Sequence, residues 1–207
     1  SIYALLTHDV SLVSFLWTTF ITGILGFFLF QFFSYPSQEL THREGIVLVI
    51  TSWVTAITLG TLPFYFSGYF PEFTAAFFES TSGFTTTGAT IVDDIEALPK
   101  SLLLWRALTH WIGGMGIIVL SIAILPLIGT GGMELYRAEF SGARSEKLTP
   151  RIAETAAALW KLYLAFTVMT FLALRWAGMN SFDAICHAFS TMATGGFSTR
   201  NESIESF

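Results

Sequence analysis

Four long apolar runs alternate with shorter polar links along the chain. They cover residues 10–35, 45–70, 101–128 and 152–176. Each is longer than the roughly 20 residues that an α-helix needs to cross the hydrocarbon core of a bilayer. The first run has no charged residue, whereas the third holds Arg106 and His110 and the fourth holds Glu154 and Lys161. The pattern predicts four membrane-spanning helices.

Two shorter semi-apolar segments, residues 71–84 and 181–192, do not fit this length. Each leads into a stretch rich in Thr and Gly, which reads TTTGAT from residue 85 and ATGGFST from residue 193. A segment of this size is too short to span and suits a half-helix that re-enters the membrane. Non-helical backbone at membrane depth is tolerated only where protein or a water-filled path satisfies its polar groups. We therefore expect two re-entrant loops, each a half-helix followed by an extended stretch.

A shift of 108 residues lays the second loop on the first. It aligns Gly88 with Gly196, Thr86 with Thr194, and Glu79 with His187. The order of long apolar helix, half-helix and Thr/Gly stretch recurs at this spacing. Self-similarity of this kind indicates a structural unit that is used more than once.

Such a unit suits one wall of a cation path. An extended Thr/Gly stretch can offer carbonyl and hydroxyl oxygens that replace the hydration shell of an ion. Glycine permits the backbone angles that this requires, and the half-helix turns the negative end of its dipole toward the cation. Asp93, Asp94 and Glu96 follow the first stretch and would raise the local cation concentration.

Composition agrees with a membrane protein and excludes other classes. Only 12% of the residues are charged and 53% are hydrophobic, whereas soluble domains have about 25% charged residues. The net charge of -5, without a dense basic cluster, argues against nucleic acid as a partner. Cys186 is the single cysteine, so the chain has no internal disulfide framework and no cysteine-based zinc site. Its apolar neighbours predict a buried thiol.

The motifs GFTTTGAT, HWIGGMGIIVL and ATGGFST together resemble the Trk/Ktr/HKT superfamily of potassium transporters, and in particular its TrkH-type membrane subunit. The resemblance covers nearly all of the chain from about residue 10. It implies an all-α membrane protein of helix–pore loop–helix repeats, with re-entrant half-helices and extended filter strands. Four such repeats surround one pathway in the family, and this chain carries one full repeat and part of a second. The gating loop of the family belongs to the third repeat, which this chain lacks.

The resemblance also implies which residues form a K⁺ filter. They are Thr86, Thr87 and Gly88 in the first repeat and Thr194, Gly195 and Gly196 in the second, with Thr85 and Ala193 at the edges. Glycine rather than serine at position 88 is typical of the potassium-selective members. The expected function is potassium uptake by downhill permeation, in a transporter that is not an enzyme and has no cofactor besides the transported K⁺.

The partners and the location follow from the same resemblance. It implies the lipid bilayer of the bacterial inner membrane, a homodimer, and gating by a cytoplasmic nucleotide-binding regulatory subunit (TrkA-like). The basic residues His42, Arg43, Arg137, Arg144, Lys147 and Arg151 mark the cytoplasmic side by the positive-inside rule, so the filter loops open to the outside.

We divide the chain into four parts on this basis. Residues 1–42 form an N-terminal transmembrane helix and a cytoplasmic link, and residues 43–128 form the first repeat. Residues 129–150 form a cytoplasmic linker, and residues 151–207 form the incomplete second repeat. The linker is either a solvated connector or a docking segment for the regulatory subunit.

Several polar residues in the apolar segments have more than one interpretation. An ionisable residue at membrane depth marks a functional or paired site. Arg106 follows Pro99 closely and could snorkel outward, but we expect it to pair with Glu79 or with a half-helix carbonyl. Glu79 and His187 are expected to face the protein interior, with Glu79 holding the first Thr/Gly stretch by hydrogen bonds. Lys161 is too isolated for an assignment. The GGMG motif at residues 113–116 is either a close-packing patch or a bend point.

Other functions than permeation are possible for these residues. Ser82 with His110 or His187 could form the dyad of an intramembrane serine protease, but nothing in the sequence fixes the geometry that nucleophilic catalysis needs. That reading also gives no reason for a second Thr/Gly stretch. A pore-loop cation channel with weak selectivity remains an alternative. A non-transporting membrane scaffold would tolerate bulky substitution at Gly88.

Overall fold

The computed structural model of the chain describes residues 11–33, 42–128 and 148–207. These residues contain helices and no strand. The helices are α2 (Leu12–Phe33), α3 (His42–Phe66), α4 (Phe73–Phe84), η1 (Ile95–Ala97), α5 (Lys100–Ile128), α7 (Leu148–Trp176), α8 (Ser181–Met192) and η3 (Ser203–Ser206). The predicted all-α class is confirmed. The predicted linker covers residues 129–150. Its residues 129–147, which include Arg137, Arg144 and Lys147, lie outside the described residues.

The four long helices α2, α3, α5 and α7 correspond to the four apolar runs. Within the described residues, three stretches are long and apolar enough to cross a membrane: Leu12–Phe32, Arg43–Phe66 and Glu154–Trp176. The predicted count of four spans therefore holds for three. α5 occupies the third run over 29 residues, and it differs from the others in carrying Arg106 and His110 fully buried.

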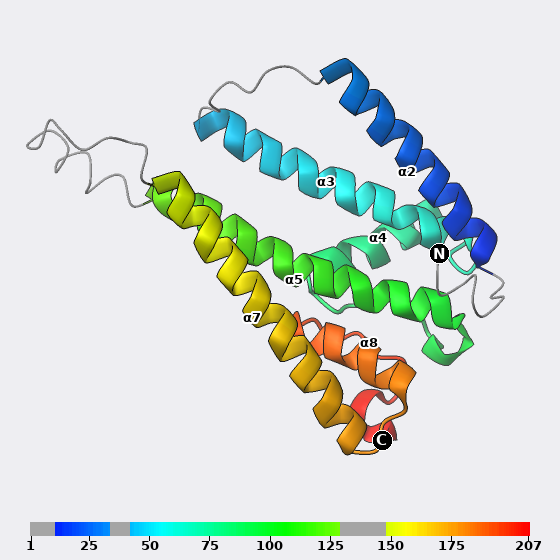
Figure 1. Cartoon of the computed structure of the whole chain (residues 1–207). Coiled ribbons are helices and arrows are strands. Elements are labelled where there is room, and N and C mark those ends of the chain that lie inside the picture. Colours follow the sequence, from blue (N-terminus) through cyan, green and yellow to red (C-terminus); the bar gives the residue numbers. More distant parts are fainter. Residues whose placement is uncertain (1–10, 34–41, 129–147) are drawn as a thin grey trace, which may run out of the picture.

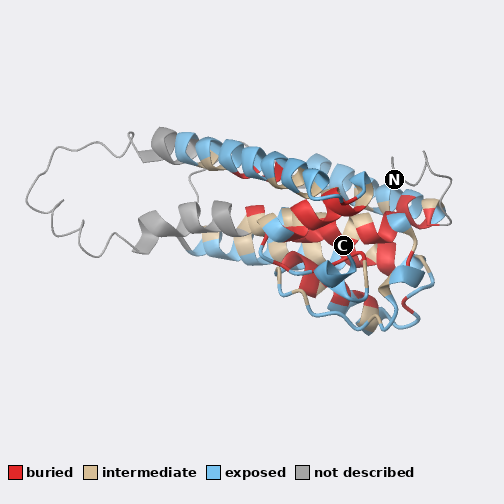
Figure 2. Ribbon diagram, turned by 90° about the horizontal axis from the view of Figure 1, so that it is seen from below, coloured by how far each residue is buried: buried red, intermediate tan, exposed pale blue. Residues whose placement is uncertain are grey.

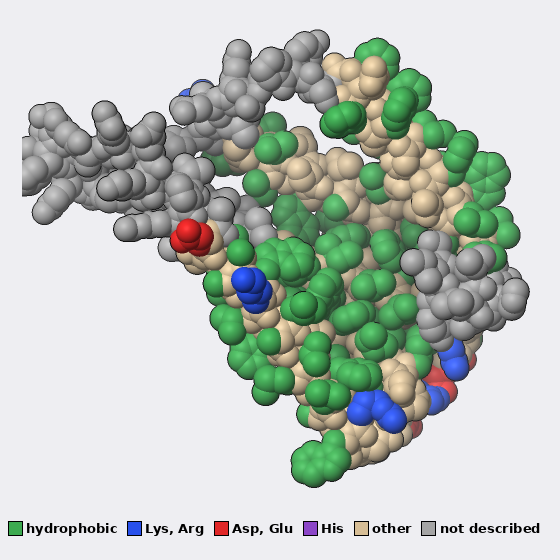
Figure 3. All heavy atoms as spheres, viewed as in Figure 1, with side chains coloured by type: hydrophobic (Ala, Val, Ile, Leu, Met, Phe, Trp, Pro, Cys, Tyr) green, Lys and Arg blue, Asp and Glu red, His purple; other side chains and the backbone are tan. Residues whose placement is uncertain are grey.

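The outer surfaces of α2, α3 and α7 are apolar and exposed. Examples are Phe30, Val47 and Met169, one from each helix. Figure 3 shows hydrophobic side chains over most of the described surface in that view, with few charged groups among them. Because water would not favour such a surface, it is the surface expected of helices that contact lipid.

The threonines of α3 show how polar side chains are accommodated on such a helix. The hydroxyl groups of Thr51, Thr58 and Thr61 donate to carbonyl oxygens four residues earlier, at 2.7–2.8 Å. This bond satisfies the hydroxyl group within the helix. The helical threonines at these positions are therefore satisfied within their own helix.

The two short helices lie on either side of α5 (Figure 1). α4 packs against α3 and α5, whereas α8 packs against α5 and α7. Both are 12 residues long, and their first residues, Phe73 and Ser181, are 108 positions apart. The half-helices predicted at 71–84 and 181–192 are thus present, and α5 lies between them.

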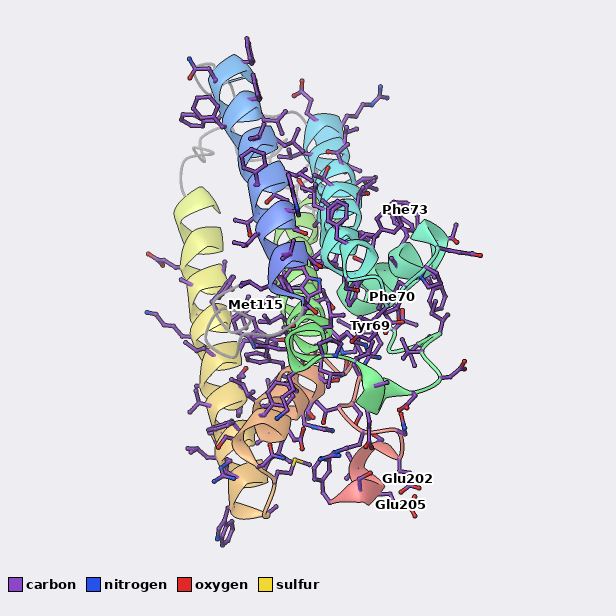
Figure 4. The ribbon with its side chains drawn as sticks, turned by 90° about the vertical axis from the view of Figure 1, so that its right-hand side faces the viewer. Tyr69, Phe70, Phe73, Met115, Glu202 and Glu205 are labelled. Carbon is purple, nitrogen blue, oxygen red and sulfur yellow. The ribbon has the colours of Figure 1, made fainter. Side chains whose placement is uncertain are left out.

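Figure 2 shows the buried residues gathered at one end of the described part, and many of them belong to α4, α5 and α8. One cluster of buried apolar side chains joins α2, α3, α4 and α5; it comprises Phe15, Phe64, Phe70, Ala76, Leu98, Leu102 and Leu103. The rings of Phe64 and Phe70 meet edge to face at 5.3 Å, and Figure 4 shows Tyr69, Phe70 and Phe73 at the start of α4. This packing fixes the half-helices at one end of the long helices.

Candidate functional site

Each half-helix runs into an extended segment, which we name the first segment (residues 85–90) and the second segment (residues 193–198). Thr86 and Thr194 have φ angles of 55° and 54°, and Gly88 and Gly196 have φ angles of 76° and 95°. The left-handed conformation costs an L-residue about 1–2 kcal/mol, and for a β-branched residue it is a genuine outlier. Two threonines with this conformation, 108 positions apart, show that both loops make the same turn.

The hydrogen bonds that end the two half-helices have the same register. In the first loop, the N–H groups of Thr85, Thr86 and Thr87 donate to the carbonyl oxygens of Thr81, Gly83 and Ser82, at 2.9–3.0 Å. In the second loop, the N–H groups of Ala193, Thr194 and Gly195 donate to those of Phe189, Thr191 and Ser190, at 2.9–3.3 Å. Each of these three bonds has its counterpart 108 residues later, so the repeat predicted from the sequence extends to individual backbone atoms.

Several carbonyl groups of the two segments remain available for another partner. Among the described residues, no hydrogen-bond donor reaches the carbonyl oxygens of Thr86, Thr87, Gly88, Thr194 and Gly196. The side chains of Thr87 and Thr194 are exposed, as is Gly196, whereas Thr86 and Gly88 are half-buried. Because buried or membrane-level carbonyl groups need partners, these oxygens are suited to a ligand that replaces water.

The two segments lie against each other at their glycines. A Cβ added to Gly88 would overlap the carbonyl oxygen of Gly195 and would lie 3.6 Å from the Cα of Gly196. A Cβ added to Gly196 would meet no atom within 4 Å. Glycine at position 88 is therefore required both by its positive φ and by this close approach, whereas at position 196 only φ requires it.

The eight predicted filter residues do not all have the same surroundings. Gly195 and Ala193 are buried, because Gly195 lies against the ring of His110 and Ala193 lies against Gly114 of α5. Thr85 is exposed, and its hydroxyl group bonds that of Thr87 at 2.8 Å. The structure thus brings Thr86–Gly88 and Thr194–Gly196 together, with Ala193 and Gly195 packed behind the accessible surface. Whether these residues bind an ion stays a prediction.

Glu79 and His187 hold the far ends of the two segments. The hydroxyl group of Thr90 donates to both carboxylate oxygens of Glu79, at 3.0 and 3.1 Å. His187 Nε2 lies 3.1 Å from the hydroxyl oxygen of Ser198, which is the counterpart of Thr90 under the 108-residue shift. Both Glu79 and His187 are buried. Their interior position and the role of Glu79 in holding the first segment are confirmed.

Arg106 of α5 pairs with Glu79, as expected. Its Nε donates to Glu79 Oε1 at 2.7 Å, and both side chains are at most 1% exposed. Taking two charges out of water is costly, and such a pair is retained only with close geometry and further hydrogen bonds. Thr90 supplies those bonds to the carboxylate. The positive charge of Arg106 is therefore neutralised beside the segments.

A sequence model of the TrkH family, described as a cation transport protein, matches residues 10–207. The chain belongs to the TrkH family. It is 47% identical over 207 residues to the Trk system potassium uptake protein TrkH of Escherichia coli K12, covering 99% of this chain and 43% of that protein. It is 42% identical over 169 residues to the Trk system potassium uptake protein TrkI of Halomonas elongata, covering 82% of this chain and 34% of that protein.

The fold agrees with that of a solved family member. The crystal structure of the potassium transporter TrkH from Vibrio parahaemolyticus matches all of this chain and 41% of its own, with a TM-score of 0.83 and 43% identity. The present TrkH-family chain thus spans less than half the length of these relatives. The family consists of transporters and not of enzymes, so the protease interpretation of Ser82 is wrong. In the structure the imidazole groups of His110 and His187 pair with Ser190 and Ser198 instead.

The GGMG motif of this TrkH-family chain is a close-packing patch. A Cβ added to Gly113 would overlap the backbone of Phe84 at the end of α4, and one added to Gly114 would lie 3.0 Å from the Cα of Ala193. One added to Gly116 would lie 2.6 Å from the ring of Trp53. Small residues let helices approach closely in membranes, and here they let α5 contact the ends of both half-helices.

The contacts of Arg200 and Asn201 were not anticipated from the sequence. Arg200 pairs with Glu96 at 3.3 Å, and the side chain of Asn201 donates to Asp94 at 2.9 Å. Asn201 also accepts from the N–H of Ile95 at 2.7 Å. These bonds tie the loop after the second segment to the loop after the first. Asp94 and Glu96, expected to attract cations, therefore also join the two repeats.

No group of three His, Cys, Asp or Glu residues in the described ranges is arranged to hold a metal ion. Cys186 is buried at 2% exposure, as its apolar neighbours predict. Lys161 lies exposed on α7, away from the two segments in sequence. The oxygen-rich segments are consequently the strongest candidate for ion binding in this part of the chain.

Proposed function

We propose that this chain forms part of the K⁺ path of a TrkH-family transporter that takes up potassium by downhill permeation. The predicted filter residues are Thr86, Thr87 and Gly88 in the first segment and Thr194, Gly195 and Gly196 in the second, with Thr85 and Ala193 beside them. The observation that carries the proposal is the repeated left-handed threonine turn at the ends of two half-helices. Strained backbone that recurs at one place in a fold is typical of functional sites.

The chemistry of the segments supports a cation as the ligand. Backbone carbonyl oxygens replace the hydration shell of K⁺ in selectivity filters, and carbonyl groups of both segments accept no hydrogen bond from the described residues. α4 and α8 direct their C-terminal ends at these segments, which adds negative potential. The two segments form one part of the wall, and the remaining part is supplied by further repeats of the transporter.

The setting of the site belongs to the same proposal. The transporter lies in the bacterial inner membrane with the filter loops open to the outside. The relatives are named as proteins of the Trk system, which supports gating of this transporter by a cytoplasmic nucleotide-binding regulatory subunit. We also propose that the transporter is a homodimer. The chain divides into the parts 1–42, 43–128, 129–150 and 151–207.

Cation flux into liposomes tests the function. A full-length transporter carrying this sequence would be reconstituted, and entry of K⁺, Rb⁺ and Na⁺ would be compared for wild type, Gly88→Ser and Gly26→Ser. Gly26 lies on α2 with no atom within 4 Å of an added Cβ, so it is the matched control. We expect K⁺ and Rb⁺ to enter faster than Na⁺, and only Gly88→Ser to reduce this preference.

Two outcomes would contradict the proposal. Equal entry of Na⁺ and K⁺ through the wild type would favour the weakly selective cation channel. Wild-type behaviour of Gly88→Ser would show that the segments do not contact the ion, since a serine there cannot keep the present approach to Gly195.

A further inference from the structure

One arginine of α5 contacts the second segment directly and is linked to the first segment through Glu79 of α4. Arg106 Nε donates to Glu79, which accepts from Thr90 in the first segment. Arg106 Nη1 donates to the carbonyl oxygen of Ser198 in the second segment at 3.2 Å. Thr90 and Ser198 are counterparts under the 108-residue shift. The guanidinium group therefore joins equivalent positions of two successive repeats.

The same face of α5 holds the rest of the second segment. The guanidinium carbon of Arg106 lies 4.1 Å from the centroid of the Phe197 ring, and the ring of His110 stacks on Phe197 at 4.0 Å. His110 Nδ1 lies 3.1 Å from Ser190 Oγ, which accepts from the N–H of Gly196 at 3.0 Å. The side chains of this group are buried: Arg106, His110, Ser190 and Phe197.

We propose that Arg106 is a positioning residue that sets the place of the second segment relative to the first, and through it the selectivity among cations. This inference rests on the proposed function of the two segments. The inner helix of the first repeat thus carries the residues that fix the filter segment of the next repeat. Arg106 itself does not contact the ion, because its charge is paired with Glu79 and buried behind the segments.

Holding Glu79 and the carbonyl group of Ser198 at the same time requires the shape of an arginine side chain. A guanidinium group presents several N–H donors in a rigid planar fork, so that Nε and Nη1 reach two acceptors in different directions. The same plane stacks on an aromatic ring, here that of Phe197. Lysine carries one nitrogen on a flexible stem. It can keep the pair with Glu79 but cannot also hold the carbonyl group of Ser198 at the present distances.

The test is Arg106→Lys in the full-length reconstituted transporter, with Arg175→Lys as control. Arg175 also donates to a backbone carbonyl, that of Met179 in the link between α7 and α8, and no hydrogen bond joins it to either segment. The readouts are the K⁺/Na⁺ permeability ratio, total K⁺ flux, and folding by size exclusion. For Arg106→Lys we expect folded protein whose K⁺/Na⁺ permeability ratio falls by roughly threefold to tenfold. A hydrogen bond from a charged group is worth about tenfold or more in an equilibrium constant, and only part of that free energy distinguishes K⁺ from Na⁺.

The expected result for Arg175→Lys is an unchanged ratio. A wild-type ratio in folded Arg106→Lys would overturn the inference and leave Arg106 with a purely structural role. If Arg106→Lys does not fold, Phe197→Leu replaces it: this variant keeps the Arg106–Glu79 pair and removes both ring contacts, and an unchanged ratio would overturn the inference equally. Absence of K⁺ preference in the wild type would instead refute the proposed function.

Discussion

Substitution of Gly113 tests the contact between α5 and the end of α4, because the contact decides whether alanine raises or lowers the stability. A Cβ added at Gly113 would overlap the carbonyl oxygen of Phe84 and would lie 2.8 Å from its carbonyl carbon and 3.1 Å from its Cα. These are backbone atoms of a helix end that is fixed by the hydrogen bonds of Thr85 and Thr86. No rotation of a side chain can relieve the overlap. Gly113→Ala therefore requires α5 and α4 to separate.

The expected magnitude follows from two opposing effects. Alanine in place of a helical glycine stabilises by about 0.5–1 kcal/mol where space is open. Inserting a methyl group into a well-packed site costs about 1–3 kcal/mol, and a backbone neighbour places Gly113 toward the upper part of that range. The net loss for Gly113→Ala is about 2 kcal/mol, or about 4–8 °C in Tm. Gly26→Ala, with open space around it, is expected to raise the Tm by about 1–4 °C.

Thermal unfolding in detergent, followed by circular dichroism, measures both variants against wild type. The two substitutions are chemically identical and both lie within helices, so opposite signs isolate the packing contact from helix propensity. A Tm for Gly113→Ala at or above that of wild type would refute the close approach of α5 to α4. A fall for Gly26→Ala would show that alanine is not favoured over glycine in these helices.

Two substitutions in the Arg106–Glu79–Thr90 network, one control substitution and one thiol reagent give further tests. Glu79→Gln leaves the charge of Arg106 buried without a carboxylate, and should lower the free energy of unfolding by about 3–5 kcal/mol; an unchanged denaturation midpoint would contradict the ion pair. Thr90→Val removes a hydrogen bond to a charged group and should cost about 1.5–3 kcal/mol, whereas Thr51→Val on the exposed face of α3 should change stability by less than about 0.5 kcal/mol. Cys186 should react with a thiol reagent only after denaturation, and rapid labelling of folded protein would show that the thiol is accessible.

The local features of this fold could be predicted from the sequence because each has a pattern of its own. The length of the apolar runs predicted the long helices, and the shorter runs predicted α4 and α8. The 108-residue shift aligned Gly88 with Gly196, and both have positive φ. Arg106 was predicted to pair with Glu79 or with a half-helix carbonyl because an ionisable residue at membrane depth needs a partner, and the structure gives it Glu79.

Contacts between distant segments had no such signal. The bond from Arg106 to the carbonyl oxygen of Ser198 spans 92 positions, and it depends on how α5 lies between the two half-helices. Gly195 and Gly196 look alike in sequence, yet one is buried against His110 and the other is exposed with positive φ. Arg200 finds Glu96 only because the two loops lie side by side. Tertiary packing decides each of these.

If the first and second segments line a K⁺ path, the ion must bind beside their carbonyl oxygens. Crystals of the full-length transporter grown with Rb⁺ would test it most directly, since Rb⁺ substitutes for K⁺ and can be located by its anomalous scattering. We expect an anomalous peak at coordinating distance from carbonyl oxygens of both segments, near Thr86–Gly88 and Thr194–Gly196. A Rb⁺ peak elsewhere in the transporter, with none beside these carbonyl groups, would contradict it.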